Sequence, residues 1–153
     1  WQSDADQEGT TQAEDTDAVN SKVRYDLACA RDRPTRDLDA SASRGPVHHG
    51  SMSESVRSVI RQNEGRSRPG DVFMMNNPFN GGTHLPDVTV ITPVFDEAGE
   101  AIIFYTASRG HHADIGGKTP GSAPPDSETI DEEGVVIDNF LLVEKGRFRA
   151  KET

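Results

Sequence analysis

Residues 88–106 read VTVITPVFDEAGEAIIFYT and hold the pattern that decides the fold. Two runs rich in β-branched and aromatic residues, 88–95 and 101–106, flank the polar, glycine-containing segment 96–100. Such runs on either side of a short turn are typical of two antiparallel strands joined by a hairpin loop. Similar short apolar runs, each next to a turn-like segment, occur at 72–75 and 140–143. The sequence therefore predicts a β-rich domain organised around this hairpin.

One amphipathic helix is predicted at residues 51–62. Its apolar residues recur at i, i+4, i+7 and i+8 and form a single stripe: Met52, Val56, Val59 and Ile60. Ser51 with Glu54 three residues later forms a capping-box pattern at the start, and Asn63 and Gly65 are suitable terminators. The predicted fold class is α+β, with β-rich structure, one clear helix and long Gly/Pro-rich loops.

The charge of the chain excludes some classes of partner. The 153 residues carry 26 acidic and 16 basic side chains, which gives a formal net charge of -10. A general nucleic-acid binder or a protein that docks on an anionic membrane needs a basic surface, so neither partner is expected. Residues 1–22 hold six acidic side chains against Lys22 and almost no large apolar residue. They predict a disordered acidic tail ahead of a domain at 23–153.

The start of the chain and its single cysteine bear on its origin. The first residue is Trp1 rather than Met, so we expect a fragment of a longer protein. Cys29 lies on the apolar face of an alternating segment, 23–30, which predicts a strand with a core cysteine rather than a nucleophile. One cysteine excludes an intrachain disulfide and favours a reducing compartment, the cytoplasm. Residues 31–45 contain Leu38 as their only large apolar residue and predict a solvated loop.

Two Gly/Pro-rich segments carry the residues that suggest chemistry. His84 and Asp87 lie in the first, 76–87, and the second, 109–125, contains three further candidates close together: His111, His112 and Asp114. If the intervening hairpin brings the segments together, imidazoles and carboxylates converge in a mixed N/O set that suits Mn, Fe or Zn. The alternative is a turn that merely holds a surface histidine.

Two other motifs are given structural interpretations. Gly116–Thr119 resembles the end of a phosphate-binding loop, but His112 stands where the first glycine is required, so this assignment is rejected. Glu132 and Glu133 follow a Ser/Pro-rich segment and are interpreted as a solvated turn.

Several strings, in the right order, closely resemble the hydantoinase B/5-oxoprolinase family. The matching strings are GSMSESVR (50–57), RPGDVF (68–73), NNPFNGGTHLPDVT (76–89), RGHHADIGG (109–117), TPGS (119–122) and EEGVVI (132–137). The resemblance covers about residues 46–145, so the chain is interpreted as a partial domain of the N-terminal part of this family. The acidic tail has no counterpart in it.

The resemblance implies an activity and its partners. Such proteins open cyclic amides such as 5-oxoproline or hydantoins at the expense of ATP, which an A-type subunit or domain binds and uses to activate the substrate. The B-type part then completes the chemistry. Carried over by position, the resemblance points to a divalent metal at His84, Asp87 and His111. His112 and Asp114 are candidate catalytic residues and, with His48, weaker candidates for ligands.

The sequence also departs from the family. Relatives have an apolar strand where residues 31–45 stand, although the spacing from Cys29 to His48 is kept. Compensating reading-frame errors are our hypothesis for this segment, and translation of the encoding DNA in its other frames tests it. Two alternatives to the hydrolase remain open here: a subunit of an ATP-dependent ketone carboxylase, and a truncated, non-catalytic piece.

Overall fold

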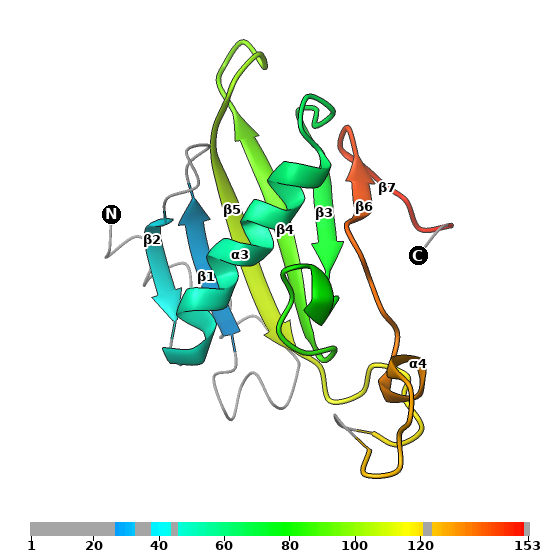
Figure 1. The fold of residues 1–153 in the computed structure, drawn as a ribbon. Helices are drawn as coiled ribbons and strands as arrows, with labels where there is room; N and C mark the ends of the chain where they lie inside the picture. Colours follow the sequence, from blue (N-terminus) through cyan, green and yellow to red (C-terminus); the bar gives the residue numbers. More distant parts are fainter. Residues whose placement is uncertain (1–26, 33–37, 44–45, 121–123, 152–153) are drawn as a thin grey trace.

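The computed structural model describes residues 27–32, 38–43, 46–120 and 124–151 (Figure 1). Its described strands form one antiparallel sheet of seven strands in the order β2-β1-β5-β4-β3-β6-β7. The strands are β1 (Leu27–Asp32), β2 (Leu38–Ser43), β3 (Val72–Met75), β4 (Asp87–Phe95), β5 (Ile102–His111), β6 (Phe140–Glu144) and β7 (Arg147–Phe148). The helical elements are α3 (Pro46–Gln62), the short 3-10 helix η1 (Pro78–Asn80) and α4 (Ile130–Glu133). The predicted α+β class is confirmed.

The core lies between α3 and the sheet face that this helix crosses (Figure 1). Three residues of the apolar stripe predicted on the helix, Met52, Val56 and Val59, are buried there, and Ile60 is partly buried. Strands β3, β4 and β5 supply the other half of the cluster: Phe73, Met75, Ile91, Tyr105 and Ala107. Since strand side chains alternate, every second residue of β4 and β5 faces the helix. The hairpin predicted at 88–106 is confirmed, because β4 and β5 pair along nearly their whole length.

The predicted start of the helix is wrong. We expected Ser51 to cap it, but α3 begins at Pro46, so Ser51 lies inside the helix. Proline is well tolerated in a first turn, where its missing N–H leaves no hydrogen bond unmade. Glu54 faces solvent and pairs with Arg61 at 2.9 Å instead of closing a capping box. The predicted end is correct, since the helix stops at Gln62 and Gly65 has a left-handed φ of 69°.

The solvated loop predicted at 31–45 is also wrong in part. Residues Leu38–Ser43 form β2, which pairs with β1 at the edge of the sheet. A ladder is made by backbone N–H and C=O groups, so an edge strand can form with few apolar side chains. The expected tail at 1–22 lies outside the described residues, and the core role proposed for Cys29 concerns a side chain outside them too.

The segment that holds Glu132 and Glu133 differs from the solvated turn we expected. It contains α4, a single helical turn that carries three acidic side chains. Negative charge is favourable there because the first N–H groups of a helix point outward unpaired. In the part of the chain that the structure describes, no helix is long and apolar enough to cross a membrane.

Candidate metal centre

The two predicted segments lie at the same end of the sheet, one just before β4 and the other just after β5. Asp87, the first residue of β4, is the register partner of His111, the last residue of β5. In an antiparallel pair the start of one strand adjoins the end of the other. The segment before β4 and the segment after β5 therefore meet, although the whole hairpin separates them in sequence.

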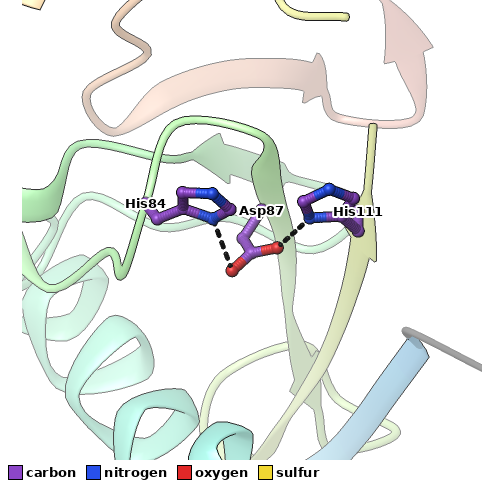
Figure 2. Close-up of side chains that lie close together, drawn as sticks. All are labelled: His84, Asp87 and His111. Atoms are coloured by element: carbon purple, nitrogen blue, oxygen red, sulfur yellow. Dashed lines mark hydrogen bonds and ion pairs between the residues drawn. The ribbon is translucent and has the colours of Figure 1, made fainter. Parts of the chain in front are cut away.

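Asp87 lies between two histidines (Figure 2). Its Oδ1 atom is 2.9 Å from Nδ1 of His111, and its Oδ2 atom is 3.1 Å from Nδ1 of His84. The imidazole rings are stacked, with centroids 5.4 Å apart and an interplanar angle of 21°. Thr83 donates a further hydrogen bond of 3.0 Å to Oδ2. The structure thus brings together the three residues that the sequence predicted as a cluster.

This donor set fits a divalent metal. The three residues offer ligand atoms that all lie within 4.8 Å of one another. Among the described residues, no hydrogen bond engages the Nε2 atom of either His84 or His111. A carboxylate that holds Nδ1 of a metal-binding histidine fixes the ring and makes it a stronger ligand. Asp87 can therefore act as a ligand or as the group that orients both imidazoles.

The electrostatics of Asp87 favour its charged form. Burial by itself would raise the pKa of this carboxyl, but hydrogen bonds from His111, His84 and Thr83 and the charge of His84 together hold the pKa below its ordinary value of 3.8. Only 8% of the Asp87 side chain is exposed, against 40% for His84 and 22% for His111. The centre therefore presents a buried anion beneath two more accessible imidazoles.

A pH dependence of stability follows from that lowered pKa. A carboxyl whose pKa is lower in the folded than in the unfolded state stabilises the fold above its unfolded pKa, here 3.8. This stabilisation is lost as the pH falls from 3.8 through the folded-state value. We expect urea unfolding of the metal-free chain between about pH 2 and pH 6 to show a steeper acid-side loss than the Asp87→Asn variant shows. Identical slopes in the two proteins would contradict the assignment.

Asn76 anchors the segment that carries His84. It is fully buried, and its side-chain amide donates to the carbonyls of Leu85 and Val135 at 2.8 and 2.9 Å. Its Oδ1 atom accepts a hydrogen bond of 2.6 Å from the backbone N–H of Ile137. The bonds to Val135 and Ile137 join segments about 60 residues apart in sequence, so this one residue fixes the segment of His84 relative to the chain that follows α4.

Gly82 closes the same segment, and its substitution tests how tightly the segment is held. A Cβ atom at Gly82 would lie 2.6 Å from the carbonyl oxygen of Asn77 and even closer to that of Asn76. We expect Gly82→Ala to destabilise the protein by about 1–3 kcal/mol, the usual cost of overpacking. Urea unfolding of Gly82→Ala and Gly110→Ala makes the comparison, because a Cβ at Gly110 meets no atom within 4 Å. Equal stability of the two variants would show that the segment gives way.

Arg109 was not predicted as part of the centre. It is fully buried beneath the centre, and its guanidinium donates to three hydroxyls: Thr89 at 2.8 Å, Ser51 at 2.6 Å and Ser55 at 2.7 Å. Burial lowers the pKa of Arg109, and the charge of Asp87 opposes that shift. The sequence held a signal for this position: Arg109 and His111 are two residues apart on one strand, so both side chains lie on the face that α3 covers.

The other candidates lie apart from the cluster. His112 and Asp114 are exposed, and Asp114 accepts a hydrogen bond of 2.8 Å from the backbone of Gly116, which forms a local turn. The side chain of His48 lies outside the described residues, and the catalytic roles of His112 and Asp114 stay predictions. Residues 116–119 lie in irregular chain between β5 and α4, which agrees with the rejection of a phosphate-binding loop.

Comparison with known families shows which family the chain belongs to. The family model described as hydantoinase B/oxoprolinase matches residues 3–153. This chain belongs to the hydantoinase B/oxoprolinase family. The match extends into residues 1–22, so the expectation that the acidic tail has no counterpart in the family is wrong. The disorder of this tail stays a prediction.

Relatives within the hydantoinase B/oxoprolinase family are far longer than this chain. The 5-oxoprolinase of Saccharomyces cerevisiae is 48% identical over 143 residues, which are 94% of this chain and 11% of the relative. The 5-oxoprolinase 1 of Arabidopsis thaliana is 48% identical over 145 residues, 95% of this chain and 11% of the relative. The caprolactamase subunit beta of Pseudomonas jessenii is 35% identical over 104 residues, 68% of this chain and 18% of the relative.

Solved structures share the fold. The ATP-dependent caprolactamase from Pseudomonas jessenii superimposes with a TM-score of 0.86 at 28% identity, over 98% of this chain and 26% of that chain. An acetone carboxylase in its nucleotide-free form superimposes with a TM-score of 0.82 at 19% identity, over 98% of this chain and 20% of that chain. At that identity the second likeness concerns the fold alone. The antiparallel sheet with its crossing helix is thus a unit that recurs within larger enzymes.

Proposed function

We propose that this chain carries the metal-binding part of an enzyme that opens cyclic amides, of the 5-oxoproline or hydantoin type, at the expense of ATP. One observation carries the proposal: His84, Asp87 and His111 form a compact N/O cluster in a chain that is 48% identical to proteins named 5-oxoprolinase. Buried charge and partly exposed imidazoles are what a site for a metal and a small substrate requires.

The chain's own residues have distinct tasks in this proposal. Asp87 orients both imidazoles and balances the charge of a cation, while His84 and His111 remain open to solvent on the other side of their rings. A bound Mn²⁺, Fe²⁺ or Zn²⁺ would orient water and stabilise negative charge on the opening amide. His112 and Asp114 are exposed just beyond His111. They are the candidates for carrying protons to and from the amide nitrogen of the substrate ring.

ATP belongs to a partner in this proposal. An amide is a poor electrophile, and phosphorylation of its oxygen creates a leaving group. Among the described residues no strand leads directly into a glycine-rich turn and helix of the phosphate-binding kind. We therefore assign ATP binding to an A-type subunit or domain. We assign this chain and its A-type partner to the reducing cytoplasm, which suits a chain with one cysteine.

A graft tests the proposal. This chain replaces the matching segment of the yeast 5-oxoprolinase, and ATP-dependent release of glutamate from 5-oxoproline is measured with metal content. We expect the graft to be active and the graft with Asp87→Asn to lose both metal and activity. A folded graft that keeps full activity with Asp87→Asn would refute the metal role. Turnover that needs a ketone and bicarbonate would instead favour the carboxylase alternative, and a folded but inactive graft would favour the non-catalytic one.

A further inference from the structure

A cavity of about 160 Å³ adjoins the candidate metal centre. His84 belongs to both, since its ring contacts Asp87 and also lines the cavity. One wall comes from the segment before β4 and the other from α4. The cavity is therefore built by parts of the chain that are distant in sequence, like the centre itself.

The size and the walls of the cavity suit one small ring. Four of its lining residues are apolar: Pro78, Leu85, Pro86 and Ile130. In another protein an apolar cavity of about 150 Å³ binds a single benzene molecule. A ligand with one five- or six-membered ring would thus fill such a space. The apolar wall of the cavity would bury the methylene groups of that ring away from water.

Of the residues that the structure describes, Thr83, His84 and Glu133 form the polar lining. Thr83 donates its hydroxyl proton to Asp87. The Oε1 atom of Glu133 accepts a hydrogen bond of 3.1 Å from Ser127, and among the described residues no hydrogen bond engages its Oε2 atom. An ionised carboxylate only accepts hydrogen bonds. Glu133 therefore selects a ligand that brings a donor, such as the N–H of an amide.

Glu133 is held in place by the segment after β5. The backbone N–H of Lys118 donates to the carbonyl of Glu132 at 2.8 Å, and that of Val135 donates to Ile115 at 2.9 Å. Gly117 packs so closely on the Glu133 carbonyl that a Cβ atom has no room there. The carboxylate thus sits on a supported turn, which gives it the fixed position that recognition needs.

We propose that this cavity binds the ring of a small monocyclic amide, with its methylene edge against the apolar wall and its N–H donated to Glu133. The proposal rests on the proposed function, because it places the substrate ring beside His84, Asp87 and His111. It makes Glu133 and Ile130 specificity-determining residues: a ring that is fused to another ring is too large for the cavity, and a ring methylated at its amide nitrogen binds more weakly because it has no N–H to donate to Glu133.

Ligand-observed NMR on the full chain tests this, with 2-pyrrolidinone and N-methyl-2-pyrrolidinone as the two probes. We expect wild type to bind 2-pyrrolidinone about tenfold more tightly, the effect of one hydrogen bond to a charged group. Glu133→Ala is expected to abolish that preference, and Glu128→Ala, an exposed matched control, to keep it. Ile130→Trp fills the cavity and is expected to remove binding of both probes, whereas Ile103→Trp, at a residue that is 50% exposed, is not.

Chemical-shift mapping on wild type keeps the test valid if Ile130→Trp fails to fold. Shifts at Thr83, Leu85 and Ile130 support the cavity, and shifts confined to other residues overturn it. Equal binding of the two probes, or a preference that survives Glu133→Ala, also overturns it. A metal titration of the same sample separates the two proposals: metal binding without probe binding refutes only the cavity, and probe binding at the cavity without metal binding refutes the proposed function.

Discussion

Replacing Asp87 with asparagine is expected to weaken the binding of Mn²⁺ or Zn²⁺ by about 10- to 100-fold, the usual effect of losing a group that supports metal-binding histidines. The carboxylate accepts from both Nδ1 atoms, at 2.9 and 3.1 Å. An asparagine keeps the shape but offers one acceptor and no charge, so one ring loses its partner and the cation loses its counter-charge. Isothermal titration of the chain with each metal measures the effect.

The matched control for this substitution is Asp126→Asn. Asp126 is exposed and contributes no side chain to the cluster, so the same loss of one negative charge is expected to leave metal affinity within about twofold. If both variants bind metal as wild type does, then the cluster is a hydrogen-bonded structural feature and not a metal site. Circular dichroism of each variant confirms that the comparison is made between folded proteins.

Arg109→Ala is expected to destabilise the protein by about 3–5 kcal/mol, the range for emptying a large buried position. The guanidinium has no exposed surface, and it joins Thr89 of the sheet to Ser51 and Ser55 of α3. Its removal leaves a cavity and deprives three hydroxyls, two of them fully buried, of a donor. Urea unfolding measures the change in free energy.

Arg61→Ala is the control, because it makes the same truncation at an exposed position of α3. Arg61 pairs with Glu54 on the surface, where such ion pairs contribute about 1 kcal/mol or less. A second variant, Arg109→Met, keeps most of the side-chain volume and is expected to lose less stability than Arg109→Ala. If Arg109→Ala and Arg61→Ala unfold alike, the guanidinium is not a structural element of the interface between α3 and the sheet.

Local patterns predicted what depends on local chemistry. The hairpin and the apolar stripe of α3 follow from the periods of strand and helix, which side chains within a few residues determine. The meeting of His84 with His111 followed from placing both segments beside one hairpin. The start of α3 was missed because the capping-box pattern at Ser51 was preferred to Pro46 as the start signal, and β2 was missed because backbone pairing with β1 decides it.

The buried network around Arg109 shows what was beyond such patterns. Ser51 and Ser55 of α3 interrupt the apolar surface, but their sequence does not say which partner they meet. The sheet register decides it, since Thr89 and Arg109 are paired across β4 and β5. Only the folded arrangement of helix over sheet reveals that these polar groups satisfy one another.

The pairing of Asp87 with His111 has an evolutionary consequence at the opposite end of the hairpin. The turn at 96–101 lies eight or more residues along the strands, about 25–30 Å from the centre. The Asp96 carboxylate accepts from the backbone N–H groups of Glu100 and Ala101, and Gly99 has a left-handed φ of 71°, so these two residues hold the length of the turn. Inserting or deleting one residue there is expected to slide the strands and to set Asp87 opposite a neighbour of His111. The length of this distant turn is therefore a heritable trait on which the centre depends.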